Sequence, residues 1–163
     1  MQEKIIIHPL LATDIDFLKE MFYESLYTHD DELPLPKSII NQPELKKYYH
    51  NWDLPNDISF IAKIENTNIG VVWCRFFTND KPSYGFIDEQ TPELGIAIKS
   101  TFRGKRIGTL LMNNLFEVLH TKSIKQISLS VDSRNRAFYL YQNLGFKTIK
   151  TENYTKLMVK HLF

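Results

Sequence analysis

The sequence has little cysteine, little net charge and no long hydrophobic run, and each shortage excludes a class of protein. The single cysteine, Cys74, excludes an internal disulfide and any zinc site built from several cysteines. Lysine and arginine number 20 against 19 acidic residues, so the chain lacks the basic excess typical of proteins that bind nucleic acid non-specifically. No segment approaches the roughly 20 apolar residues of a membrane-spanning helix, and the N-terminus MQEKIIIHPL has no signal-peptide pattern. We therefore expect a cytoplasmic protein that binds neither nucleic acid nor membrane.

The composition itself is that of a globular protein. The chain has 163 residues, of which 43% are hydrophobic and 24% charged, so it is long enough to bury a core and too apolar to be disordered. It contains no internal repeat, linker or low-complexity segment. The sequence predicts a single domain spanning 1–163.

Hydrophobic periodicity predicts alternating groups of strands and helices. The predicted strands are residues 4–8, 57–64, 69–77, 93–98, 126–131, 146–151 and 154–163. The predicted helices are one that begins after an N-cap at Thr13, one over 43–52, one that follows residue 106, and one over 136–144 ended by Gly145. The order β-α-α-β-β-β-α-β-α-β-β favours an α/β (α+β) fold with a mixed, mostly antiparallel central sheet flanked by helices. A parallel crossover is expected between residues 93 and 131.

Two amphipathic stripes identify the faces of the longer helices. The first helix carries Ile15, Leu18, Met21, Phe22 and Leu26, and the helix after residue 106 carries Leu110, Leu111, Leu115, Val118 and Leu119. The last strand ends in MVKHLF, which is apolar enough either to pair across a homodimer or to lie inside the sheet.

The stretch FRGKRIGTLL at 102–111 gathers positive charge between two hydrophobic segments. Gly104 and Gly108 allow a ligand to approach the backbone closely. Arg103, Lys105 and Arg106 add charge beside a helix N-terminus, where free N–H groups and the helix dipole favour an anion. The stretch is either a pyrophosphate site or a helix start with solvated cations. It matches neither the P-loop nor the Rossmann pattern.

Three motifs in register narrow this choice. RGKRIG at 103–108 resembles the phosphate loop [Q/R]-x-x-G-x-[G/A] of the GNAT superfamily of N-acetyltransferases, with Arg106 where the family usually has its first glycine. SVDSRNRAFYLYQNLGF resembles the family's N-x-A-x-x-L-Y-x-x-L-G-F segment, and PELGIAI resembles its central strand. Together the three motifs span 93–146.

The resemblance implies a GNAT-like fold and an acyltransferase that moves the acetyl group of acetyl-CoA directly to a primary amine of a small molecule or peptide. It implies an acetyl-CoA-binding set made of Ile96, Ala97, Ile98, Arg103, Gly104, Lys105, Arg106, Ile107, Gly108, Thr109, Asn135, Ala137 and Tyr141. The backbone around Ile96–Ala97 would polarise the thioester carbonyl. A non-catalytic acyl-CoA-binding regulatory module is the alternative.

Two residues are the candidates for catalysis. Tyr141 is the expected partner of the departing thiolate, with Tyr139, roughly 200° away around the helix, assigned to packing. Glu93, at the start of the central strand, is the candidate general base, acting directly or through water, although a strand-end carboxylate in solvent is equally compatible. Asp88 and Glu89 are weaker alternatives.

The remaining polar and aromatic residues are less specific. The five histidines show no metal-ligand spacing, so no metal is expected, and Cys74 is predicted to be buried as a small hydrophobe. The loop THDDELPLPK and a group of aromatic residues would either bind a cationic amine or form a solvated loop over a packed core. These residues are Tyr23, Tyr27, His29, Asp30, Asp31, Glu32, Trp52, Trp73 and Tyr84.

Overall fold

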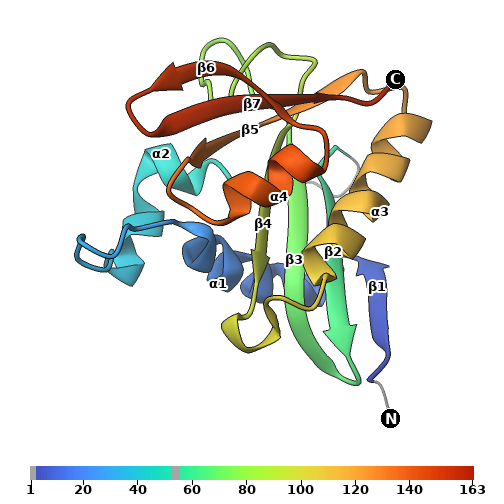
Figure 1. Ribbon diagram of the computed structural model, residues 1–163. Coiled ribbons are helices and arrows are strands. Elements are labelled where there is room, and N and C mark those ends of the chain that lie inside the picture. The colour runs from blue at the N-terminus through green and yellow to red at the C-terminus, as the bar shows by residue number, and fades with distance from the viewer. Residues whose placement is uncertain (1–2, 53–55) are drawn as a thin grey trace.

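Seven strands form one sheet in the order β1-β2-β3-β4-β5-β7-β6 (Figure 1). The computed structural model describes residues 3–52 and 56–163. The strands are β1 (Ile5–Pro9), β2 (Ile58–Ile64), β3 (Thr67–Arg75), β4 (Glu93–Ile98), β5 (Gln126–Asp132), β6 (Lys147–Glu152) and β7 (Thr155–His161). Neighbouring strands are antiparallel, except that β4 and β5 are parallel. The predicted mixed, mostly antiparallel sheet is confirmed.

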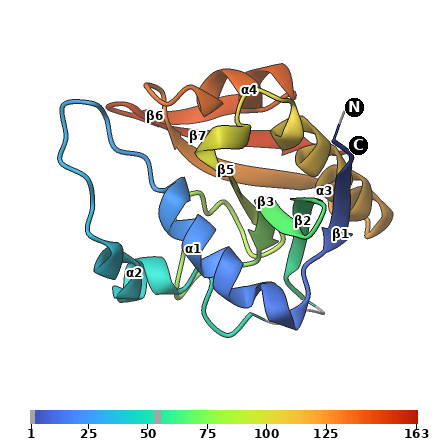
Figure 2. The same cartoon turned by 90° about the horizontal axis from the view of Figure 1, so that it is seen from below.

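Helices cover both faces of this sheet. They are α1 (Ile15–Ser25), α2 (Pro43–Lys46), α3 (Ile107–Thr121) and α4 (Ala137–Asn143), with 3-10 turns at Ala12–Asp14, Lys37–Asn41 and Ser100–Phe102. Figure 2 shows α1 on one side of the sheet and α3 and α4 on the other. Leu18, Met21 and Phe22 of α1 pack into one hydrophobic cluster, and the buried side of α3, including Leu111 and Leu115, packs into a second. The α3 segment makes the parallel crossover between β4 and β5, as predicted.

Three local predictions are wrong. Thr13 is not the N-cap of α1, because it lies within a 3-10 turn; the adjacent Asp14 instead accepts the Leu11 N–H at 2.9 Å. Leu110 is 43% exposed rather than part of the buried stripe, since the buried face of α3 is shifted to Ile107 and Met112. The helix predicted over 43–52 stops at Lys46 and continues as turns, with Asn51 at a φ of 52°.

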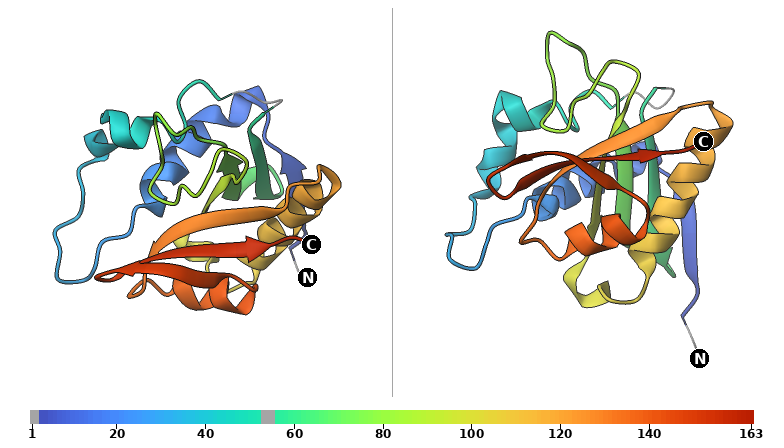
Figure 3. Two further views of the ribbon diagram at one scale, coloured as in Figure 1. Left: turned by 90° about the horizontal axis from the view of Figure 1, so that it is seen from above. Right: turned by 45° about the horizontal axis from the view of Figure 1, so that its top comes forward.

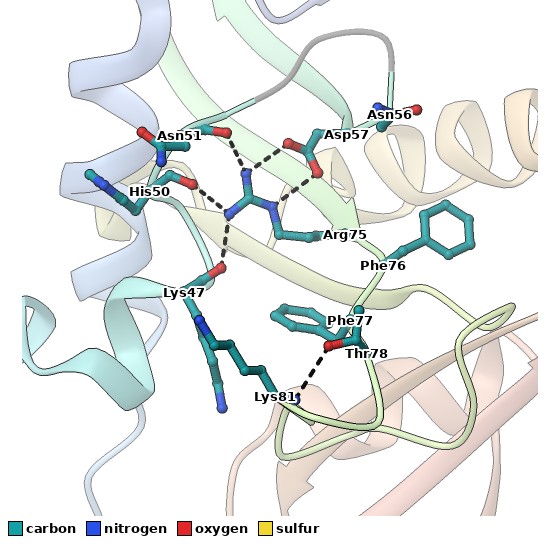
Figure 4. Close-up of a pocket in the computed structure, with 10 residues that line it drawn as sticks. All are labelled: Lys47, His50, Asn51, Asn56, Asp57, Arg75, Phe76, Phe77, Thr78 and Lys81. Carbon is teal, nitrogen blue, oxygen red and sulfur yellow. Dashed lines mark hydrogen bonds and ion pairs between the residues drawn. The ribbon is translucent and has the colours of Figure 1, made fainter.

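Arg75 at the end of β3 explains how that interrupted segment is held (Figure 4). Its guanidinium donates to the backbone oxygens of Lys47 and His50 at 2.8 Å and of Asn51 at 3.2 Å. It also forms a bidentate ion pair with Asp57, in which Nε donates to Oδ1 at 2.9 Å and Nη2 donates to Oδ2 at 2.7 Å. Arg75 and these four partner residues line a cavity of about 350 Å³. One arginine therefore satisfies three carbonyl groups that a regular helix would otherwise have used.

The C-terminal strand lies inside the sheet. Strand β7 pairs with β5 on one side and with β6 on the other, so the second of the two alternatives for MVKHLF is correct for this chain. Strand β6 is the edge strand beyond it and is exposed along its whole length. The homodimer stays a prediction.

Replacing Arg75 with methionine removes the guanidinium and leaves Asp57 in a buried position. We expect the free energy of unfolding to fall by about 3 kcal/mol, because removing one partner leaves a buried charge uncompensated. Urea unfolding followed by circular dichroism measures this. Lys147→Met on the exposed edge strand is the matched control and should change stability by less than about 0.5 kcal/mol. An equal loss in both variants would contradict the structural role of Arg75.

Candidate active site

The two parallel strands at the centre of the sheet separate almost as soon as they meet. Within the described residues, β4 and β5 pair at Glu93 and Ser128, where the Ser128 N–H donates to the Pro92 oxygen at 3.0 Å. Beyond this point β5, β7 and β6 run obliquely across β1 to β4 (Figure 3). A parallel pair normally continues its hydrogen bonds along both strands. The divergence therefore leaves backbone groups of β4 without a strand partner.

The alternation of backbone direction identifies those groups. The Lys99 N–H donates to the Ile69 oxygen of β3 at 2.8 Å, so odd-numbered residues of β4 direct their backbone groups toward β3. Ile96 and Ile98 consequently direct theirs into the gap, where the Ile98 oxygen accepts a 3.1 Å hydrogen bond from Arg103 Nε. Ala97 directs its backbone toward β3. Of the pair Ile96–Ala97, Ile96 is therefore the one whose N–H can meet a group in the gap.

The loop between β4 and α3 has two residues in the left-handed region. Gly104 has a φ of 78°, and Arg106, the N-cap of α3, has a φ of 63°. Glycine adopts this conformation without strain, whereas other residues pay roughly 1–2 kcal/mol. This conformation favours a glycine at the position that Arg106 occupies. The chain keeps the loop shape with a strained arginine instead.

The first turn of α3 lies beside the gap. A Cβ atom added to Gly108 would lie 3.5 Å from Leu140 Cδ2 and 3.7 Å from Ile96 Cδ1, so this turn faces both β4 and α4. Arg103, Lys105 and Arg106 are exposed around it, and none pairs with a carboxylate in the described part of the chain. Ile107 is buried and anchors the turn in the core, and Thr109 is half-buried beside it. Free N–H groups and unpaired cations make this turn suitable for a phosphate.

Asn135 and Tyr141 both lie in the segment that follows β5. The Asn135 Oδ1 accepts the Ala137 N–H at 3.0 Å and so organises the first turn of α4, which leaves the Asn135 amide nitrogen as a donor. The Tyr141 ring packs against Phe146 with centroids 5.9 Å apart, and its side chain is 8% exposed. Burial raises the pKa of Tyr141 to about 12. Its hydroxyl forms no hydrogen bond within the described residues.

Glu93 occupies the closed end of the gap and is 7% exposed, so the solvent-exposed interpretation of this carboxylate is wrong. Its carboxylate accepts the Tyr48 hydroxyl at 3.2 Å to Oε2, and the Gly85 N–H at 3.1 Å to Oε1. Burial raises the pKa of Glu93 to about 7, while the nearby hydroxyls of Ser83 and Tyr48 act in the opposite direction. A carboxyl group with this pKa exchanges a proton readily near neutral pH.

Glu93 and Tyr141 lie on opposite faces of the sheet. Side chains alternate along β4, and Trp73, whose ring covers Gly95, packs with the α1 cluster, so the odd-numbered residues of β4 face α1. Tyr141 belongs to the cluster on the α3 face. Glu93 and Tyr141 therefore flank the sheet from its two faces.

The aromatic residues predicted to line an acceptor wall separate into two groups. The Tyr48 ring lies between Phe22 and Tyr84, with centroids 5.6 and 6.4 Å away, on the same face as Glu93. Trp73 is buried in the core, and Trp52 stacks on Arg75 at 4.9 Å. These two therefore do not line a wall beside Glu93. Sequence reasoning missed Tyr48, which lies in the segment predicted as a helix over 43–52.

Tyr139 was assigned to packing, but this is wrong, since it is 64% exposed. The loop acids Asp88 and Glu89 are exposed, and their oxygens cap the N–H groups of Gln90 and Asn79 at 2.9 Å. Cys74 is buried as predicted, with burial raising its thiol pKa. Neither of the two cavities described, of about 350 and 570 Å³, contains a predicted catalytic or acetyl-CoA-binding residue.

Arg134, which precedes Asn135, links the loop over 26–36 to the second half of the sheet. Its guanidinium pairs with Asp132 at 2.7 Å and with Glu32 at 3.5 Å, and it lies over the Tyr154 ring at 4.1 Å. Figure 3 shows this loop extending from α1 toward the β6–β7 turn. The loop is therefore tied to the second half of the sheet through Arg134. Of its acids, Glu32 is paired with this arginine, and the His29 ring lies 3.4 Å from Asp31.

Among residues 3–52 and 56–163, no group of three or more His, Cys, Asp or Glu side chains could hold a metal ion. Within the same residues, no helix has the length and apolar character needed to cross a membrane. The cytoplasmic location stays a prediction.

The chain resembles known proteins both in sequence and in fold. The model of the Acetyltransferase (GNAT) family matches residues 19–146, which is most of the chain. No curated protein matches the chain significantly.

Solved structures share its fold. A PaiA N-acetyltransferase from Thermoplasma acidophilum in complex with coenzyme A is 21% identical, with a TM-score of 0.69 over 97% of this chain and 99% of that one. A GNAT-family acetyltransferase from Staphylococcus aureus Mu50 is 18% identical, with a TM-score of 0.71 over 98% and 100%. The ribosomal-protein-S18-alanine N-acetyltransferase from Escherichia coli is 15% identical, with a TM-score of 0.69 over 98% and 94%.

The burial of Glu93 makes folding stability depend on pH. Because its pKa is raised in the folded protein, its favourable contribution is complete below about pH 4.5 and is lost as the pH rises through about 7. We expect Glu93→Gln to gain about 3 kcal/mol of unfolding free energy relative to the wild type between pH 4 and pH 8. Urea unfolding at both pH values measures this, with the exposed Glu24→Gln as control. A pH-independent difference would mean that Glu93 ionises normally.

Proposed function

The chain belongs to the GNAT acetyltransferase family, and from this premise we propose that it is an acetyl-CoA-dependent N-acetyltransferase acting on a primary amine of a small molecule or peptide. The gap between β4 and β5 carries the proposal. It offers unpaired backbone groups at Ile96, with Tyr141 on one face of the sheet and Glu93 on the other. Since the family match covers both strands that border the gap, we place the reaction there.

The residues around the gap fit acetyl-CoA. The exposed cations and free N–H groups at the start of α3 would hold the pyrophosphate, and the Asn135 amide nitrogen would donate to the pantetheine arm. Acetyl-CoA itself supplies an activated acetyl group as a thioester. The Ile96 N–H would polarise the carbonyl of that thioester. A regulatory acyl-CoA-binding module would need these features as well, but it would not need a base.

Glu93 and Tyr141 differ in how they would handle protons. Glu93, with a pKa of about 7, would accept a proton from the amine directly or through water. Tyr141, with its pKa raised to about 12, holds its proton more tightly than a thiol with a pKa near 8.5. Full transfer to the thiolate would be uphill by about 5 kcal/mol. Tyr141 would therefore donate a hydrogen bond to the thiolate and keep its proton.

The proposal is tested by measuring thiol release from acetyl-CoA with a panel of primary amines and amine-bearing peptides. At least one amine should accelerate release, and mass spectrometry should show a product heavier by one acetyl group. We expect Glu93→Gln to lower kcat at least 100-fold and Tyr141→Phe to lower it about 10-fold, because both act on protons in the transition state. The exposed neighbour Tyr139→Phe is the matched control and should retain the wild-type rate. Binding of CoA without accelerated release by any amine would favour the regulatory module.

A substitution at Gly108 tests CoA binding independently of folding stability. We expect Gly108→Ala to raise the Kd for CoA at least 10-fold, because its methyl group would project between Ile96 and Leu140 beside the proposed pyrophosphate site. The added Cβ meets only ordinary van der Waals distances, and alanine favours a helix, so the free energy of unfolding should stay equal or rise by up to about 1 kcal/mol. Calorimetric titration and urea unfolding measure the two effects. Unchanged CoA affinity would remove α3 from the proposed site.

A further inference from the structure

Tyr48 is the one tyrosine among those described whose hydroxyl contacts a carboxylate. It lies just after α2, 45 residues before Glu93, and its hydroxyl is 3.2 Å from Oε2 and 3.4 Å from Oε1 of that residue. Two other buried or half-buried tyrosines use their hydroxyls for anchoring: Tyr49 donates to the Ile40 oxygen at 2.8 Å and Tyr23 to the Leu35 oxygen at 2.5 Å. The Tyr48 hydroxyl thus contacts a carboxylate, whereas the hydroxyls of Tyr23 and Tyr49 donate to backbone oxygens.

The direction of the Tyr48 proton is fixed by a second hydrogen bond. The Tyr84 N–H donates to the Tyr48 hydroxyl oxygen at 2.8 Å, so one side of that oxygen is occupied by a donor. A phenol oxygen has one proton to give, and Glu93 is the acceptor within reach. Burial, followed by the Glu93 charge, raises the pKa of Tyr48, so the hydroxyl stays protonated over the whole range of enzyme assays. Tyr48 is a permanent donor to Glu93.

The Tyr48 ring is also held in place. It stacks between Phe22 of α1 and Tyr84 with interplanar angles of 21° and 10°, and Phe77 contacts it at a centroid distance of 5.1 Å. On the other side of the carboxylate, Gly85 lies so close that an added Cβ would stand 2.7 Å from Glu93 Oε1. The carboxylate therefore accepts hydrogen bonds from two different segments: from the Tyr48 hydroxyl, and from the Gly85 N–H in the loop between β3 and β4. Groups held by packing in this way are preorganised.

Few other charges face Glu93. Lys47 lies close enough to lower its pKa, although its ammonium also pairs with Glu44 at 2.9 Å. Arg75 on β3 lies directly opposite Glu93 in the strand register, but its guanidinium forms an ion pair with Asp57 instead.

The remaining neighbours of Glu93 are uncharged. From α1 the neighbouring residue is Phe22, which reaches the site through Tyr48, and from β5 it is Ser128, whose hydroxyl donates to the Gly85 oxygen at 2.6 Å. The buried Ser83 hydroxyl, which lowers the pKa of both Glu93 and Tyr48, completes the set. Tyr48 is thus the titratable side chain that touches the carboxylate directly.

We infer that Tyr48 is a positioning residue for the general base: its hydroxyl orients the Glu93 carboxylate and sets the pH at which that carboxylate becomes ionised. The inference rests on the proposed function, in which Glu93 takes the proton of the amine. A hydrogen bond to the ionised form of an acid favours that form. Removing the Tyr48 hydroxyl should therefore leave Glu93 protonated to a higher pH.

The experiment compares Tyr48→Phe with Tyr49→Phe, since both variants lose one phenol hydroxyl while keeping an aromatic ring that packs on Phe22. The pH profile of kcat/KM for the acceptor amine is measured at saturating acetyl-CoA. In Tyr48→Phe the acidic limb should move up by about one pH unit, so that the rate falls about 10-fold at pH 6 and approaches the wild-type rate at pH 9. The KM for acetyl-CoA should not change. Tyr49→Phe should leave the limb in place.

A second readout does not depend on activity. Carbon-13 NMR of labelled glutamate, assigned by its loss in Glu93→Gln, should show the Glu93 titration moving upward in Tyr48→Phe and not in Tyr49→Phe. A Tyr48→Phe variant that is slower by one factor at every pH, with an unmoved Glu93 titration, would reduce Tyr48 to a structural residue and overturn the inference. If no amine is acetylated but the NMR titration moves, the proposed function fails while the electrostatic coupling stands. If no amine is acetylated and the Glu93 titration is also unchanged in Tyr48→Phe, both the proposed function and the inference about Tyr48 are wrong.

Discussion

The parting of β4 from β5 is the constraint on which the rest of the structure depends. In the described part of the chain β4 and β5 pair in register at Glu93 and Ser128, and the strands diverge from there. If the pairing continued, the backbone of Ile96 would be hydrogen-bonded to β5 and the sheet would separate its two faces completely. Because it stops, the Ile96 backbone is left without a partner on β5, and the two faces of the sheet are not separated there.

The segments around the gap reinforce this opening. The α3 crossover puts a helix N-terminus at the wide end, with Gly108 close to both β4 and α4. The α1 face contributes the aromatic stack around Tyr48 and the loop that Arg134 ties to the far half of the sheet. The carboxylate of Glu93 sits at the narrow end, where burial and two donors act on it in opposite directions. The α3 N-terminus and the Glu93 carboxylate thus lie at opposite ends of β4.

Much of the fold could be predicted from the sequence, because the strands and the longer helices carry clear periodicity. The errors have local physical causes. The segment 43–52 has the apolar spacing of a helix, yet Arg75, more than 20 residues away, binds its carbonyl groups in turns. Thr13 is a residue type that commonly caps helices, but it is the adjacent Asp14 whose carboxylate accepts the Leu11 N–H. Leu110 fits the stripe on α3 but lies at its exposed border.

The sequence by itself determined the order of elements and the motifs beside the gap, because these depend on periodicity and on residues close together in the chain. It also placed Glu93 at the start of the central strand and Tyr141 on a short helix. Only the tertiary structure decided that Glu93 is buried, that Tyr48 donates to it across 45 residues, and that Arg134 meets Glu32 and Tyr154. The reason is physical: the pKa and contacts of a side chain depend on what packs around it, and packing joins segments that no local pattern connects.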